Sequence, residues 1–340
     1  MYGEMNKIYV HILAARPNFI KAAPVIEELS NKGYKNVIIH TNQHYDYKMS
    51  KIFFQELNIP EPDYHLGIKS GTHGEQTGRG IIEIEKVLLK IKPNNVIVYG
   101  DVNSTLSGAL AAVKLNIPIY HVESGCRSYD KSMAEEINRV LVDHISSKLF
   151  CSSQYAYNNL IKEGFNPSTL SIVGNTAIDT LHNVLKLIKK PIRQTDYYLC
   201  TLHRPFNVDD KNQLHHILSK LEQLDKKVII PAHPRLKNNI NHTYTNIEFI
   251  EPLGYIDFIN YLKYSKGAIS DSGGIQCEAS FLKIPLLTIR PSTEHLATLN
   301  LSNTLINNIN DISVSKFKDT NYDIPLIWDG NASKRIIENI

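Results

Sequence analysis

The chain has 340 residues, a length at which two domains are expected because a single hydrophobic core seldom serves so many residues. Its net charge of +3, carried by scattered lysines, argues against a nucleic-acid-binding or membrane-surface protein. No apolar run approaches the roughly 18 residues of a membrane helix, and the N-terminus lacks the pattern of a signal peptide.

The four cysteines, Cys126, Cys151, Cys200 and Cys277, form no C-x-x-C pair. Cys151 and Cys200 end apolar segments, where buried free thiols are common. These features predict a cytoplasmic protein with reduced thiols, and the missing ligand spacing predicts no metal site.

Short apolar segments alternate with longer amphipathic segments through the first half of the chain. The expected strands are residues 7–13, 36–41, 94–100, 117–122 and 148–151, and the expected helices include residues 18–31, 76–91 and 103–115. Because the apolar runs are continuous, the strands should be covered on both faces. The alternation predicts an α/β fold with a parallel sheet.

The pattern restarts after a polar, proline-containing segment. Further strands are expected at residues 197–202, 227–233, 247–253, 267–271 and 285–290. We therefore predict an N-terminal domain over residues 1–188, a linker at 189–196, a C-terminal domain over 197–328 and a terminal helix within 329–340. Asn331 or Ser333 is available as the cap of that helix. Two such domains would form a cleft at the carboxyl ends of their sheets, where α/β proteins bind ligands.

Polar residues gather directly after the predicted strands. The segments are AARPNFIKAAP (14–24), GDVNST (100–105), HVESGCR (121–127), HRPFN (203–207), HPRL (233–236) and SDSGG (270–274). Taken singly, Asp101 fits a helix cap, Glu123 a solvated carboxylate and His203 a core histidine. Their coincidence at one edge of the predicted sheets instead favours a binding site.

The Ser272-Gly273-Gly274 turn lies where a predicted strand gives way to a helix. A tight turn is the ordinary explanation. The alternative is a phosphate cradle, because free backbone N–H groups and a dipole of about +0.5 charge attract anions at a helix start.

The whole chain resembles the UDP-N-acetylglucosamine 2-epimerase family, in its non-hydrolysing bacterial and archaeal branch. The matching segments run in order from ARPNFIKAAPVIEEL through TNQHYDYKMSKIFFQELNIPEPDY, GTHGEQTG, YGDVNSTLSGALAA, HVESGCRS, EEINRVLVDHIS, GNTAIDTL, HRPFNV and EPLGY to SDSGGIQCEA. The resemblance implies two Rossmann-like domains facing across a cleft, as in B-type glycosyltransferases. It also implies a last helix packed on the first domain, and a homodimer that serves polysaccharide biosynthesis.

The family's reaction inverts C2 of an N-acetylhexosamine joined to UDP. The C2 proton is not acidic, so the implied mechanism is elimination of UDP, removal of the proton by a carboxylate, and re-addition of UDP. By resemblance, the catalytic residues are Asp101, Glu123, Glu135 and His203, with Asp101 and Glu123 assigned to acid–base work, Glu135 as a third participant or positioning group and His203 as the active-site histidine. The implied substrate-binding residues are Arg16, Lys21, Arg139, Arg204, Ser272, Gly273, Gly274 and the ribose-binding Glu278.

No cofactor is implied, because elimination needs no hydride and the turn after the first strand, AARPNF, is not G-x-G-x-x-G. Departures from the family pattern are Pro205-Phe206 where an acid is common, Cys277 where a glutamate is common, and His295 where an arginine is usual. These bear on the identity of the sugar more than on the reaction. UDP-diacetamido-uronic acids, UDP-N-acetyl-6-deoxy sugars, a hydrolysing epimerase, a glycosyltransferase and a non-catalytic binder remain alternatives.

Overall fold

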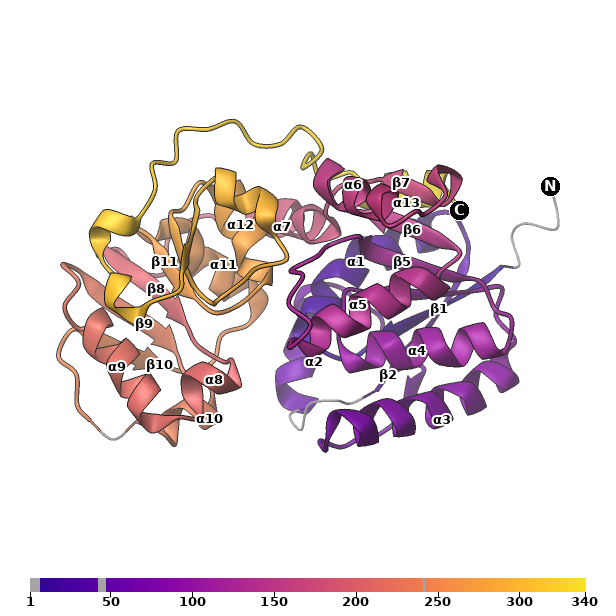
Figure 1. The fold of residues 1–340 in the computed structure, drawn as a ribbon, viewed down its shortest axis with the longest axis horizontal. Helices are drawn as coiled ribbons and strands as arrows, with labels where there is room; N and C mark the ends of the chain where they lie inside the picture. Colours follow the sequence, from indigo (N-terminus) through magenta and orange to yellow (C-terminus); the bar gives the residue numbers. More distant parts are fainter. Residues whose placement is uncertain (1–6, 42–46, 241) are drawn as a thin grey trace. The chain divides into compact units, whose positions relative to one another are not determined.

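The computed structural model describes residues 7–41, 47–240 and 242–340 (Figure 1). Residues 42–46, which belong to the matching segment that begins TNQHYDY, lie outside the described part. The chain divides into two compact units. The first contains the residues up to Thr180 together with Leu326–Ile340, and the second is Leu181–Pro325.

A seven-stranded sheet forms the centre of the first unit. Its strands are β1 (Ile8–Leu13), β2 (Lys35–His40), β3 (Tyr64–His65), β4 (Asn95–Tyr99), β5 (Ile119–Ser124), β6 (Lys148–Cys151) and β7 (Leu170–Ile172). They lie in the order β3-β2-β1-β4-β5-β6-β7, and every pair is parallel. The strand order reverses between β1 and β4, which is the topological switch point of a Rossmann-like sheet.

Helices cover this sheet. They are α1 (Arg16–Asn31), α2 (Tyr47–Glu56), α3 (His73–Ile91), α4 (Asn103–Lys114), α5 (Ala134–Ile145), α6 (Gln154–Lys162) and the terminal α13 (Ala332–Glu338), and α7 (Thr176–Leu187) begins in this unit. Helices α3, α4 and α5 pack side by side, whereas α1 packs against α2 and α13 (Figure 1). The interior is built from the apolar strand residues, and β4 is buried along its whole length, as expected for a strand covered on both faces.

The second unit repeats this topology with six strands. They are β8 (Tyr197–Thr201), β9 (Lys227–Pro231), β10 (Ile247–Ile250), β11 (Ala268–Ser270), β12 (Leu286–Ile289) and β13 (Asn303–Ile306). The order is β10-β9-β8-β11-β12-β13, again all parallel, with the switch point between β8 and β11. The helices are α8 (Pro205–Val208), α9 (Lys211–Leu221), α10 (Pro234–Lys237), α11 (Tyr255–Tyr264) and α12 (Gly274–Leu282). The predicted α/β class with two Rossmann-like parallel sheets is confirmed.

The terminal helix α13 is attached to the first unit through a buried carboxylate. Asp179 Oδ1 accepts from Ala332 N at 3.1 Å, and its Oδ2 accepts from Ser333 N at 2.7 Å and from Ser333 Oγ at 2.8 Å. Asn331 stands at the N-cap position, but its side chain makes no capping bond. The two cap candidates taken from the sequence were therefore wrong, because the acceptor is supplied from 153 residues earlier in the chain.

Residues 189–196, predicted as a linker, form no helix or strand. The two compact units meet in sequence at Thr180 and Leu181, inside α7, and the chain re-enters the first unit at Leu326.

All four cysteines are free and buried, as predicted for Cys151 and Cys200. Within the described residues, no helix combines the length and the apolar character that crossing a membrane requires.

Replacing Asp179 tests this attachment of α13. In Asp179→Ala two buried N–H groups lose their acceptor, so we expect the free energy of unfolding to fall by about 2–4 kcal/mol. Asp179→Asn keeps one acceptor oxygen but places its NH₂ group against the other N–H, so its loss should be smaller than that of Asp179→Ala, about 1–2 kcal/mol. Urea midpoints at unchanged m-value measure both. Equal losses in the two variants would contradict this role.

Candidate functional site

In the first unit, the polar residues singled out from the sequence follow strands that flank the switch point. Arg16 is the first residue of α1, directly after β1, and Asp101 follows β4. Glu123 lies near the end of β5, the next strand. Because all these strands are parallel, their carboxyl ends share one edge of the sheet, and a ligand-binding edge is expected there.

Lys21 on α1 contacts Glu123 at this edge. Its ammonium donates a short hydrogen bond to Glu123 Oε1, and both side chains are largely buried. Burial alone would lower the pKa of Lys21, but the negative charges of Glu123 and Asp101 outweigh that effect and raise it. Lys21 is therefore a fixed positive charge between two carboxylates.

The backbone at Glu123 is strained. Its φ is +71°, in the left-handed region that a non-glycine residue rarely adopts. The register between β5 and β6 shifts between Val122 and Ser124, so Glu123 is the extra residue of a bulge. Bulges of this kind redirect a side chain, and backbone strain concentrates at functional sites.

Asp101 contacts residues of α5 and does not cap α4, the helix that follows it in the sequence. Arg139 donates a short hydrogen bond to Asp101 Oδ2, and Asn138 Nδ2 donates to the Asp101 carbonyl at 2.8 Å. The N-cap of α4 is Val102, which makes no side-chain cap. The helix-cap explanation of Asp101 is thus wrong, and its carboxylate faces a cation instead.

The two neighbouring glutamates at the start of α5 differ in their surroundings. Glu136 is buried and accepts from Ser128 N and Oγ, both at 2.9 Å, from Tyr129 N at 2.8 Å, and from Arg139. It therefore holds the loop before α5. Glu135, the residue singled out from the sequence, is only partly buried in the first turn of the helix.

In the second unit, His203 and Arg204 follow β8 and meet Asp271, which follows β11. The buried Asp271 accepts from His203 N at 3.1 Å, Arg204 N at 2.9 Å and Asn207 Nδ2 at 3.1 Å, and its Oδ1 lies 2.7 Å from His203 Nδ1. Half of the His203 side chain, 52%, is exposed. The alternative explanation of His203 as a core histidine is therefore wrong.

The sequence pattern alone assigns no role to Asp271. Burial works against its ionisation, yet His203 and the N–H donors outweigh burial and hold the pKa of its carboxyl below the usual value. Because His203 Nδ1 is the ring nitrogen directed at Asp271, Nε2 is the one that points away from it. The signal in the sequence was an aspartate placed directly after a buried apolar strand.

The Ser272-Gly273-Gly274 turn does start a helix, α12, with Gly273 at the N-cap. Ser272 N already donates to Ser270 Oγ at 2.9 Å. A side chain at Gly273 would meet Glu294 Oε1 at 2.5 Å, whereas nothing lies within 4 Å of such an atom at Gly274. The open space beside this turn is therefore at Gly274, whereas the missing side chain of Gly273 accommodates Glu294.

Two further carboxylates stand beside this turn. Glu294 Oε2 accepts from Arg290 Nη2 at 2.8 Å, and both residues are buried. Glu278 on α12 is buried and accepts from the Tyr255 hydroxyl at 2.7 Å. Arg290, Glu294 and Tyr255 were not assigned a role from the sequence, because their importance depends on contacts across the unit.

Two departures from the family pattern contact each other. Cys277 Sγ lies 3.7 Å from His295 Nδ1, and both side chains are largely buried. These two departures from the family pattern therefore lie in one local contact next to the phosphate-cradle turn, and not at two separate places.

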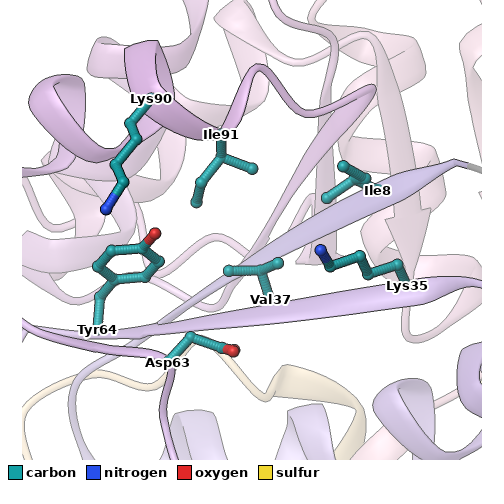
Figure 2. Close-up of a pocket in the computed structure, with 7 residues that line it drawn as sticks. All are labelled: Ile8, Lys35, Val37, Asp63, Tyr64, Lys90 and Ile91. Carbon is teal, nitrogen blue, oxygen red and sulfur yellow. The ribbon is translucent and has the colours of Figure 1, made fainter.

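A pocket of about 530 Å³ lies at the opposite edge of the first sheet. Figure 2 shows its lining residues, Ile8, Lys35, Val37, Asp63, Tyr64, Lys90 and Ile91. Ile8 and Lys35 begin β1 and β2, so the pocket is at the amino ends of these strands and contains none of the predicted site residues. In the part of the chain that the structure describes, no group of three or more His, Cys, Asp or Glu side chains could hold a metal ion.

Two Rossmann-like sheets of the same strand order, with polar residues at both switch points, define an α/β protein of the GT-B-like class. The family model described as UDP-N-acetylglucosamine 2-epimerase matches residues 27–340. The chain belongs to this family. The resemblance to the 2-epimerase family is confirmed, and with it the expectation of an epimerase, which is an isomerase that acts on a nucleotide sugar.

The similar proteins cover nearly the full chain. A UDP-N-acetylglucosamine 2-epimerase of Methanocaldococcus jannaschii is 43% identical over 354 residues, 96% of each chain. A UDP-2,3-diacetamido-2,3-dideoxy-D-glucuronate 2-epimerase of Pseudomonas aeruginosa is 42% identical over 344 residues, 96% of this chain and 97% of that one. The crystal structure of the M. jannaschii UDP-GlcNAc 2-epimerase in complex with UDP-GlcNAc and UDP matches with a TM-score of 0.87 and 41% identity over 98% of each chain.

Replacing Asp271 with a neutral residue should make the free energy of unfolding depend less on pH in the acid range. Because the pKa of Asp271 is lower in the folded protein, its stabilising effect is present above the unfolded value of about 3.9 and is lost as the pH falls through the folded value. Asp271→Asn should therefore be less stable than the wild type at pH 7, with a difference that shrinks towards pH 3. Urea unfolding of both proteins at each pH measures it, and a constant difference would disprove the assignment.

Proposed function

We propose that this protein is a non-hydrolysing 2-epimerase that interconverts UDP-N-acetylglucosamine and UDP-N-acetylmannosamine. The reaction proceeds by anti elimination of UDP and its re-addition through a 2-acetamidoglucal-type intermediate. The observation that carries the proposal is the placement of Asp101 and Glu123 around the buried Lys21 at the switch point of the first sheet. The chain's membership of the 2-epimerase family supports the substrate class.

The chemistry requires proton transfer without an acidic C–H bond. When UDP leaves C1, positive character builds on the sugar ring and the C2 proton becomes removable by a carboxylate. The pair of electrons from the C2–H bond forms the C1–C2 double bond while the C1–O bond electrons leave with UDP. Re-addition reverses these changes and delivers a proton to the other face of C2, so the two faces need two groups that exchange protons.

We assign this exchange to Asp101 and Glu123, with Glu135 as a third participant or positioning group. Lys21 is unsuited to donate the proton because its raised pKa keeps it charged. It instead serves as a counter-charge to the carboxylates, as does Arg139, which binds both Asp101 and Glu136. Crowded carboxylates tend to retain one proton, which supplies the acid form near neutral pH.

UDP gains negative charge as it leaves, so fixed donors must receive it. We assign this role to the N–H groups of Gly273 and Gly274 at the start of α12, with Arg16 and Arg204 adding charge-assisted hydrogen bonds. Ser272 contributes through its side chain, because its N–H already binds Ser270. Glu278, fixed by Tyr255, is assigned to the ribose. His203, oriented by Asp271, is assigned to the sugar or phosphate.

A second substrate is favoured by one specific relative. The P. aeruginosa 2-epimerase, which is 42% identical over 96% of this chain, is named for a diacetamido-uronate sugar. The Cys277–His295 contact beside the cradle turn, where the family pattern has a glutamate and an arginine, is a local difference that could accompany a change of sugar. Rates on the two UDP-sugars, compared as kcat/KM, decide between them. The cytoplasmic setting and the homodimer implied by the family are part of the proposal.

Incubation with UDP-GlcNAc in heavy water tests the function directly. We expect deuterium at C2 in both epimers while the sugar stays joined to UDP, measured as loss of the C2 proton signal by NMR. The same run with the UDP-diacetamido-uronate covers the second candidate. Release of free N-acetylmannosamine and UDP would identify a hydrolysing enzyme instead. Absence of C2 exchange with any UDP-sugar would reject an epimerase.

Asp101→Asn isolates the acid–base role, because it preserves shape and removes the titratable group. We expect C2 exchange to fall by about 10²–10⁴-fold with UDP affinity changed less than about threefold, measured by calorimetry. Asp196→Asn is a matched control, since Asp196 is an exposed residue directly before β8, at the amino end of that strand. Wild-type turnover in Asp101→Asn would overturn the assignment.

A further inference from the structure

A buried histidine on β5 binds the segments that carry both proposed acid–base residues. His121 has no exposed surface, and its Nε2 lies 2.8 Å from the Gly100 carbonyl oxygen. Its Nδ1 lies 2.7 Å from Asp143 Oδ1 on α5. A carbonyl can only accept, so Nε2 carries a hydrogen and donates to Gly100.

Asp143 extends these contacts to the other side of Glu123. Its Oδ2 accepts from the Gly125 N–H at 3.1 Å and from Arg127 Nη1 at 2.7 Å. Burial works against the charge of Asp143, but His121 and Arg127 outweigh it and hold the pKa of its carboxyl below the usual value. Arg127 in turn donates to Glu163 at 2.8 and 2.7 Å, so the buried charges are paired.

Along the chain, these contacts lie next to the two proposed acid–base residues. Gly100 directly precedes Asp101, whereas His121 and Gly125 lie two residues before and two residues after Glu123. Asp143 therefore holds both sides of the bulge at Glu123, and through His121 it also holds the end of β4. A residue at φ +71° stays there only when its surroundings enforce that conformation.

We propose that His121 and Asp143 form a positioning pair that fixes the distance between Asp101 and Glu123 for proton exchange at the two faces of C2. The proposal rests on the proposed function, because it takes these two carboxylates as the acid–base groups. Neither His121 nor Asp143 is exposed, so the pair acts through the backbone of Gly100 and Gly125 and not on the substrate. A displacement of about 1 Å at a reacting group is enough to cost about 10²-fold in rate.

Three substitutions of His121 separate the two contacts. His121→Phe removes both bonds, His121→Asn places its amide near the Nδ1 position and keeps the bond to Asp143, and His121→Gln places its amide near Nε2 and keeps the bond to Gly100. Glu163→Gln is the control, because it disturbs the far end of the same charge network and leaves the contacts of His121 in place.

Activity is measured as C2 exchange per UDP-binding site, with the sites counted by calorimetry so that loss of folded protein does not count as loss of rate. We expect kcat to fall about 10²-fold in His121→Phe and about 10-fold in the Asn and Gln variants. KM and UDP affinity should stay within threefold of the wild type in all three. Glu163→Gln should keep kcat within threefold while its urea midpoint falls.

The outcomes are distinct. Wild-type kcat per site in the His121 variants would overturn the positioning role and leave the proposed function standing. An equal loss of kcat per site in Glu163→Gln would also overturn it, because the rate would then depend on the charge network as a whole and not on the two contacts of His121. If His121→Phe does not fold, the Asn and Gln variants decide alone. A wild-type protein without C2 exchange on any UDP-sugar would reject the proposed function and this inference with it.

Discussion

The parallel pairing of every strand in both sheets is the constraint on which the rest of this structure depends. Parallel strands all end at the same edge, and the reversal of strand order leaves a gap in helix coverage between β1 and β4 and between β8 and β11. Side chains such as Asp101 and Asp271, placed two residues and one residue after a buried strand, are therefore brought to a switch point by topology alone. The apolar strands behind them form a rigid support.

Buried charge is the second recurring feature, and it is compensated either by cations or by N–H donors. In the first unit, cations balance the carboxylates: Lys21 contacts Glu123, Arg139 contacts Asp101, and Arg127 contacts Asp143. In the second unit, Asp271 is held mainly by backbone N–H groups and by His203. Isolated buried charges are too costly to persist, so these partners are a condition of the fold as well as of the proposed chemistry.

The carboxylates paired with cations and the glycine turn at the start of α12 suit different chemical steps. Carboxylates held between cations can exchange a proton while their positions stay fixed, which suits the chemistry proposed for C2. A turn with an open Gly274 and a helix start suits an anion that leaves and returns. The Arg290–Glu294 pair packed against Gly273 limits the space on the other side of that turn. The first unit thus supplies groups that hold charge, and the second supplies backbone N–H groups that suit an anion.

The sequence by itself determined the α/β class, because continuous apolar runs between amphipathic segments record burial on both faces of a strand. It also located Asp101, Glu123, His203 and the cradle turn, since residues that follow such runs must come to the ligand-binding edge. The edge strands β3, β7 and β13 escaped prediction, because their short and partly exposed segments YH, LSI and NTLI show no continuous apolar run.

Only the tertiary structure decided which groups pair. Lys21 and Glu123 are 102 residues apart in sequence, and Asp179 and Ser333 are 154 apart. No local pattern records such contacts, so the cap of α13, the partner of Asp101 and the role of Asp143 were not accessible from neighbouring residues. Pairing between charged groups depends on distance and burial in space, and these are fixed only when the sheets and helices have packed.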